Sequence, residues 1–173
     1  MRVNLKSWSD HDLLNRAQTL AASERKIIRE VIETLEEIES RKLYLERGYP
    51  SMYAFCTECL GYSPGSAQRR IESMRLIKRM DPAAQVHVKE GLASGRLNLT
   101  QLSQVSQVAR AEKYAPAQAL ELLKSVEALP PRESEKTVLA VRTQPVPQRE
   151  IRQRSGQETR VSLTLDEETM ALL

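Results

Sequence analysis

The stretch GYSPGSAQRRIESMRLIKRMDPAAQVHVKEGLASGRLNLT (residues 61–100) decides the fold, because it holds two helix starts and two glycine-containing turns. Ser63-Pro64 and Asp81-Pro82 each place a capping side chain directly before a proline at the first helical position. Helices are therefore predicted to begin at both sites. Gly95-Arg96-Leu97-Asn98 predicts a turn before a third helix, from Leu99 to about Arg110.

A short helix, a turn and a second helix occur twice in succession in this part of the chain. The first unit is predicted to comprise a helix over 51–60, Gly61, and a helix from 64 to about 80. The second comprises a helix over 82–94, the turn 95–98 and the helix 99–110. A helix, a short glycine-containing turn and a second helix are typical of a helix-turn-helix, so the sequence predicts two such units in tandem.

Upstream, the sequence predicts two further helices that are separated near residue 22. Ser9 is expected to cap the first, which ends about Leu20. Ser23 is expected to start a longer one that ends near Gly48. Two apolar faces define them: Leu13, Leu14, Ala17 and Leu20 on the first, and Ile28, Val31, Leu35, Ile38 and Leu45 on the second. The second stripe favours a bundle seam, with a homodimer through the 23–47 helix as the alternative.

Downstream, prolines mark the starts of two further predicted helices, and the composition changes after residue 143. Pro116 begins a predicted helix to about Leu129, and a last helix covers 132–142. Residues 144–158 are polar, basic and without periodicity, which predicts a linker. Residues 160–165 alternate as a strand does, and 166–168 begin a helix. We therefore expect an all-α multi-helix bundle over 1–143, a linker over 144–158, and a strand-helix fragment over 159–173 at the entrance to a further, truncated domain.

Composition supports a helical, soluble chain. The 173 residues are 40% apolar but only 4% aromatic, and the net charge is +3. No apolar run is long enough to span a membrane and no signal peptide begins the chain, so we expect a cytoplasmic protein. Cys56 and Cys59 are the only cysteines. Two thiolates leave zinc with unfilled positions, so we expect no metal there.

The sequence contains no recognisable catalytic constellation. His11 and His87 lie far apart, and neither stands beside a nucleophile or carboxylate in a known catalytic order. Phosphate-binding glycine loops, the H-E-x-x-H pattern and EF-hand loops are absent. We therefore expect a protein that is not an enzyme and that needs no cofactor.

One resemblance to a known family adds to this interpretation. It is carried by RKLYLERGYPSMYAFC (residues 41–56), LGYS (60–63), AQRRI (67–71) and GRLNLT (95–100). These stretches resemble the helical region that precedes the nuclease domain in bacterial HNH-endonuclease-type proteins, over roughly residues 9–170. The resemblance implies a role in DNA engagement or assembly. It implies no nuclease activity, because an HNH site needs histidine and asparagine and neither occurs after Arg142.

Candidate DNA contacts lie on the second helix of each unit. A recognition helix presents its early residues to base edges and holds phosphates with basic ones. In the first unit this description fits six residues: Gln68, Arg69, Arg70, Arg75, Lys78 and Arg79. In the second it fits Arg96 in the turn and Thr100, Gln101, Gln104 and Gln107 on the following helix. At 100° per residue the basic groups spread around the first helix, and some could instead be solvated or paired with Glu72.

Two functions therefore remain open at the level of sequence. The first is a module that binds double-stranded DNA. The second is a protein-interaction or dimerisation module without nucleic-acid binding. Their salt dependence separates them, because phosphate neutralisation releases counterions whereas an apolar interface responds little to salt.

Overall fold

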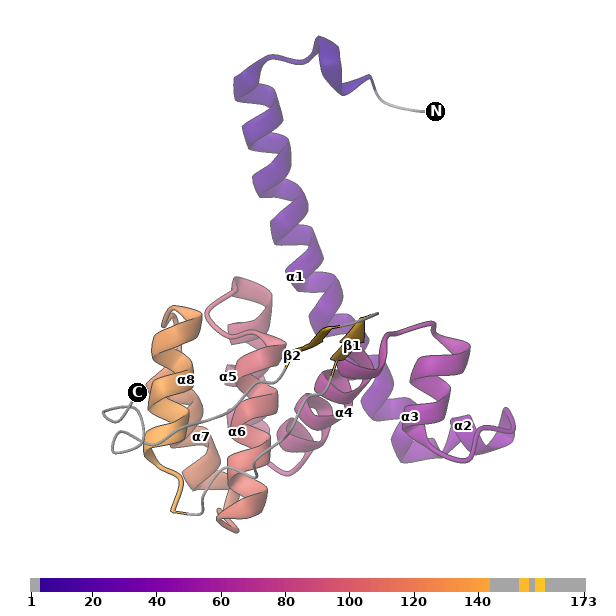
Figure 1. Cartoon of the computed structure of the whole chain (residues 1–173), viewed down its shortest axis with the longest axis vertical. Coiled ribbons are helices and arrows are strands. Elements are labelled where there is room, and N and C mark those ends of the chain that lie inside the picture. The colour runs from indigo at the N-terminus through magenta and orange to yellow at the C-terminus, as the bar shows by residue number, and fades with distance from the viewer. Residues whose placement is uncertain (1–3, 144–152, 156–157, 161–173) are drawn as a thin grey trace. The chain divides into compact units, whose positions relative to one another are not determined.

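A computed structural model describes residues 4–143, 153–155 and 158–160, and it shows an all-helical bundle followed by two short strands. The chain divides into two compact units, Met1–Arg142 and Thr143–Leu173. The first unit contains α1 (Asp10–Arg41), α2 (Leu43–Glu46), α3 (Met52–Ala54), α4 (Pro64–Lys78), α5 (Pro82–Ser94), α6 (Leu99–Ala111), α7 (Pro116–Val126) and α8 (Pro131–Ala140) (Figure 1). A 3-10 turn, Leu5–Ser7, precedes α1, and one π-helical turn, Phe55–Cys59, follows α3.

The long first helix differs from the sequence prediction, which placed a break near residue 22. Ser9 caps α1 as predicted, because its side chain accepts a hydrogen bond from the Asp12 amide at 3.1 Å. Ser23 does not cap a second helix. Its hydroxyl donates to the Thr19 carbonyl at 2.9 Å, within a run that includes no helix breaker. The prediction of two helices was therefore wrong, and α1 continues to Lys42, which adopts a left-handed conformation with φ 57°.

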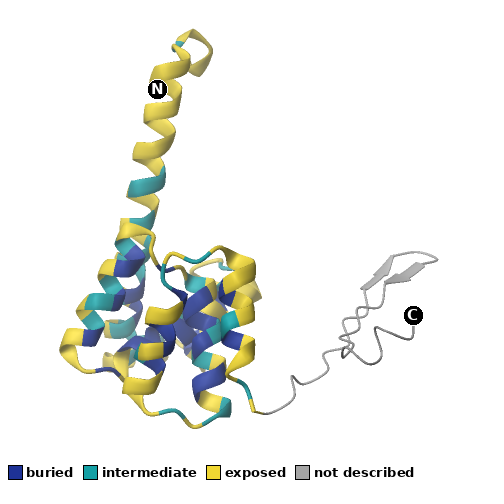
Figure 2. Cartoon of the chain, turned by 90° about the vertical axis from the view of Figure 1, so that its left-hand side faces the viewer, coloured by how far each residue is buried: buried dark blue, intermediate teal, exposed yellow. Residues whose placement is uncertain are grey.

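The two halves of α1 have different surroundings. The C-terminal half packs against α4 and α5, whereas the N-terminal half extends out of the bundle and is exposed along its length (Figure 2). Ile32 and Leu35 are buried, and Ile28, Val31 and Ile38 are half-buried. The predicted stripe 28–38 is thus largely occupied within the chain, which leaves less of it for the homodimer predicted through residues 23–47.

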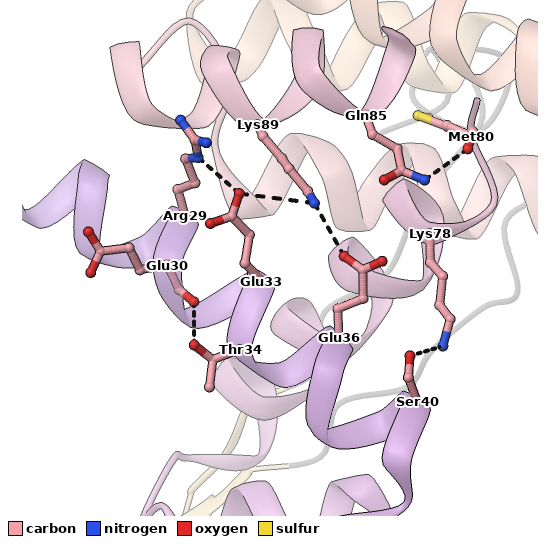
Figure 3. Close-up of polar contacts among 10 residues, drawn as sticks. All are labelled: Arg29, Glu30, Glu33, Thr34, Glu36, Ser40, Lys78, Met80, Gln85 and Lys89. Carbon is pink, nitrogen blue, oxygen red and sulfur yellow. Dashed lines mark hydrogen bonds and ion pairs between the residues drawn. The ribbon is translucent and has the colours of Figure 1, made fainter. Parts of the chain in front are cut away.

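Ion pairs hold α1 beside the next two long helices (Figure 3). Lys89 of α5 lies between two α1 carboxylates, with Nζ 3.3 Å from Glu36 and 4.0 Å from Glu33. Lys78 at the end of α4 donates to the Ser40 hydroxyl at 2.9 Å. The Lys89 contacts thus join α5 to α1, and the Lys78 contact joins the end of α4 to the end of α1.

The two helix-turn-helix-like units occur where the sequence predicts them. In the first, Ser51 caps α3, and α3 with its π-helical turn leads through Gly61 into α4. In the second, the Asp81 side chain accepts from the Ala84 amide to begin α5, and Asn98 begins α6 with a capping box. α6 packs against α4, α7 and α8, so it lies at the centre of the bundle rather than at its surface.

The second unit contains a two-stranded antiparallel sheet of β1 (Gln153–Ser155) and β2 (Glu158–Arg160). β1 lies entirely within the stretch predicted to be a linker, so part of that stretch has regular structure. The predicted strand beyond Arg160 and the helix after it lie outside the described residues.

Gly95, which ends α5, is expected to resist substitution because of its backbone conformation. Its φ is +85°, and a Cβ at this position would lie 2.7 Å from Cδ of Arg25. Gly95→Ala should lower the free energy of unfolding by about 1 kcal/mol, with most of the loss from the left-handed backbone, since the Arg25 side chain can move. Chemical denaturation measures this change.

Gly65→Ala is the matched control for Gly95→Ala. Gly65 lies in the first turn of α4 without a positive φ, and its nearest neighbour to a new Cβ is 3.5 Å away. Alanine there should stabilise the protein by about 0.5–1 kcal/mol, because it restricts the unfolded chain. If both substitutions raised the free energy of unfolding, or both lowered it, the conformational explanation would be contradicted.

Candidate nucleic-acid interface

The exposed face of α4 carries a subset of the predicted DNA contacts. Ala67, Ile71, Met74 and Ile77 are buried on its inner side. Gln68, Arg75 and Arg79 are exposed, and their spacing of seven and four residues places them on one face of the helix. These residues therefore form a polar and basic stripe on α4, and this stripe lies beside α6.

A pocket of about 290 Å³ lies between α4 and α6, and we call it the α4–α6 groove. Both helices contribute polar side chains to its walls. It is lined by Gln68, Glu72, Arg75, Leu76, Arg79, Ser106 and Arg110. Three arginines from two helices thus meet around one open concavity.

Glu72 forms the floor of this groove and is almost fully buried. Its carboxylate accepts hydrogen bonds from four side chains. They are Gln68 Nε2 at 2.7 Å, Gln107 Nε2 at 3.1 Å, Arg110 Nη2 at 3.1 Å and the Ser103 hydroxyl. Burial by itself raises the pKa of the Glu72 carboxyl, but these hydrogen bonds outweigh burial and lower the pKa below its ordinary value of 4.5. Glu72 is therefore an ionised structural hub, whereas the sequence indicated only a pairing partner for nearby arginines.

The basic side chains at the rim are held but still exposed. Arg75 pairs with Glu39 of α1, with Nη2 to Oε1 at 2.7 Å. Lys78 Nζ lies 4.0 Å from the same carboxylate. Arg79 donates to the Tyr114 carbonyl at 3.5 Å, a long contact to a neutral group. Of the charged side chains that line the groove, three are arginines and one is the Glu72 carboxylate, so the lining carries more positive than negative groups.

Arg69 and Arg70 do not line this groove. Arg70 lies with its guanidinium carbon 4.2 Å from the centre of the Tyr62 ring and donates to the Ser66 carbonyl at 3.2 Å. It connects the start of α4 to the preceding turn, which is a structural task. Arg69 is exposed on another side of the helix. Of the six residues predicted on α4, Gln68, Arg75 and Arg79 therefore line the groove, whereas Arg69, Arg70 and Lys78 do not.

The second unit supplies fewer of its predicted contacts. Gln101 is only 3% exposed. Its Oε1 accepts from the Asn98 amide at 2.9 Å, and its Nε2 donates to the Val126 carbonyl at 2.8 Å. Its predicted role as a DNA contact is therefore corrected: Gln101 caps α6 and ties it to α7. Arg96 and Thr100 are exposed and Gln104 is half-buried, and none of the three lines the groove.

Arg110 is the groove residue that the sequence prediction missed. It lies in the last turn of α6, where the helix dipole favours a basic residue, so the sequence alone explains Arg110 without a binding role. Its position beside Arg75 and Arg79 depends on how α6 packs on α4. The only local signal was its placement three residues after Gln107, on the same side of α6.

The cysteines and histidines occupy ordinary positions. Cys56 is buried and Cys59 is exposed, and burial raises the pKa of the Cys56 thiol despite the nearby Arg70. His87 Nε2 lies 2.5 Å from Glu127 Oε1, connecting α5 to the end of α7. Within the part of the chain that the structure describes, no group of three or more metal-ligating side chains is present. None of the described helices is both long and apolar enough to cross a membrane.

No family model, curated protein or solved structure matches this chain. The features of the molecule that bear on its function are therefore the lining of the groove and the exposed surfaces of the bundle.

Proposed function

We propose that the helical bundle binds double-stranded DNA, with Arg75, Arg79 and Arg110 of the α4–α6 groove contacting backbone phosphates. The observation that supports this function is the convergence of three exposed arginines from two helices on one open pocket. Guanidinium groups bind phosphate through paired N–H donors, and they stay charged at any physiological pH. The resemblance to the helical half of HNH-endonuclease-type proteins is consistent with such a role.

The proposed contact is to phosphate rather than to bases. α4 lies between α1 and α6, so its exposed face is a strip and not a protruding helix that could enter the major groove. Gln68, the predicted base reader nearest to the groove, donates to Glu72. We therefore expect binding that depends weakly on DNA sequence and strongly on salt.

Arg75→Ala combined with Arg79→Ala tests the groove. Fluorescence anisotropy with a labelled duplex at low salt should show an affinity reduced by about tenfold. The slope of log affinity against log salt should become shallower by about one to two units, because a complex with fewer phosphate contacts releases fewer counterions when it forms. Neither residue is buried, so the fold should be retained, which circular dichroism checks.

Arg69→Ala is the matched control on the same helix. It removes one positive charge from α4 outside the groove, so affinity should change little. Arg132→Ala, in the first turn of α8, removes a positive charge away from the groove, and combined with Arg69→Ala it matches the charge change of the double groove variant. A parent protein that does not bind duplex DNA, or a loss of binding with Arg69→Ala that equals the loss with the double variant, would reject the groove as the interface.

The second candidate function is protein–protein interaction, and one observation favours it specifically. The exposed N-terminal half of α1 carries several large apolar side chains, including Leu14 at 66% exposure and Leu20 at 51%. Apolar side chains gathered on one projecting helix mark interaction surfaces in soluble proteins. The two candidates concern different faces and can be tested separately.

A further inference from the structure

A regular apolar seam follows the exposed side of α1. Its residues are 13, 17, 20, 24, 27 and 31, with successive spacings of four, three, four, three and four. These are Leu13, Ala17, Leu20, Glu24, Ile27 and Val31. This is the heptad pattern of a helix that packs against another helix along its length. We call this set the α1 seam.

The α1 seam lies beside the face of α1 that joins the bundle, and it meets the bundle at Val31, which is half-buried against the core. Ile32 and Leu35 make the bundle contact and are buried. On the seam, Leu13 is 36% exposed, Leu20 is 51% exposed and Ile27 is 57% exposed. The seam thus continues past the bundle as a solvent-facing stripe, which Figure 2 shows as the exposed upper part of the helix.

We propose that the α1 seam pairs with the α1 seam of a second copy of this chain, in antiparallel orientation. The charges on the helix determine this orientation. In a parallel pair, Glu24 would face Glu24 of the second copy within the apolar layer, and like charges there repel. In an antiparallel pair, Glu24 instead faces Leu20, and its charged end can reach water beside the seam.

The same orientation also brings opposite charges together. With Leu13 opposite Val31 and Ala17 opposite Ile27, Arg16 lies beside Glu30 of the second copy, and symmetry repeats this pair. Arg16 and Glu30 are both exposed, and Figure 3 shows the Glu30 carboxylate pointing away from the other side chains drawn. Charge complementarity at these flanking positions is the feature that sets partner and orientation in paired helices. A second copy therefore satisfies both the apolar and the charged positions.

The paired segment is short, so the dimer should depend on concentration. Residues 13–31 of a helix span about 28 Å at 1.5 Å per residue. Such a contact covers fewer than three heptads and carries one acidic residue in its seam. We expect reversible association, visible as a rise in weight-average mass with concentration in sedimentation equilibrium. This inference specifies the partner for the second candidate function, and its tests measure association without DNA.

Spin labels test the orientation. In a Cys59→Ser background, where Cys56 stays buried, single cysteines replace Asn15 or Ser23, which are both exposed. Ser23 is seven residues from both Arg16 and Glu30, so it flanks the seam. In the antiparallel dimer, labels at position 23 lie almost level with each other, whereas labels at position 15 are offset by about 20 Å along the axis. Pulsed electron resonance should therefore give a clearly longer distance at position 15. Equal distances at the two positions, or no dipolar signal at either, would overturn the proposal.

Charge reversal tests the register. Arg16→Glu should weaken dimerisation roughly 3- to 20-fold, because two symmetry-related attractions become repulsions. Glu30→Arg should act similarly, and the double variant Arg16→Glu with Glu30→Arg should restore association to near the parent level. Asn15→Glu is the control, since it adds a negative charge on the solvent side of the helix. A parent protein that stays monomeric at all concentrations, or a double variant that does not recover, would refute this pairing.

Discussion

Leu102→Ala is expected to lower the free energy of unfolding by about 3–4 kcal/mol, the largest effect of any variant considered. Leu102 is fully buried in α6, the helix that packs against α4, α7 and α8. Truncation removes buried apolar surface and leaves a cavity, because helices held on several sides cannot close in. Urea denaturation followed by circular dichroism measures the change.

Leu139→Ala provides the control for Leu102→Ala. Leu139 lies on α8 and is 43% exposed, so the same truncation should cost less than about 1 kcal/mol. Similar losses in the two variants would show that α6 is not the centre of the bundle. They would also weaken the assignment of the groove, because α6 positions Arg110 beside α4.

The helix starts were predictable because their signals are local. Ser63, Asp81 and Asn98 each precede a helix that begins at the following residue. The side chains of Asp81 and Asn98 cap their helices, whereas Ser63 makes no capping hydrogen bond and α4 begins with Pro64 alone. A cap and a proline both act on neighbouring backbone groups, so no tertiary information is needed. The break predicted at Ser23 failed for the opposite reason. Serine caps a helix only when the residues before it are not helical. Residues 10–22 are already helical, so Ser23 lies inside α1.

The groove was predictable only in part, because it depends on tertiary packing. Gln68, Arg75 and Arg79 could be named from sequence, but neither the approach of Arg110 nor the burial of Glu72 could. For Gln101, the sequence did contain a local signal of a structural role. Asparagine followed three residues later by glutamine is a capping pattern, and it accounts for the buried amide of Gln101 without any nucleic acid.

Glu72→Gln is expected to destabilise the bundle by about 2 kcal/mol at pH 7. The carboxylate accepts from four donors in a buried position, and an amide at residue 72 would direct an NH₂ group at some of them. A buried donor that loses its acceptor costs about 1–3 kcal/mol. The partner Arg110 is largely exposed, so solvent compensates part of the lost ion pair.

The same substitution should change the pH dependence of stability. The pKa of Glu72 is lower in the folded than in the unfolded protein. Its ionised form therefore stabilises the fold above the unfolded-state pKa, and this contribution is lost as pH falls through the lower, folded-state pKa. The difference in unfolding free energy between parent and Glu72→Gln should thus be constant above about pH 6 and should shrink in acid. Glu135→Gln, at an exposed position on α8, is the matched control for the substitution itself. A difference that stays the same from neutral to acidic pH would mean that the Glu72 charge does not stabilise the contact between α4 and α6.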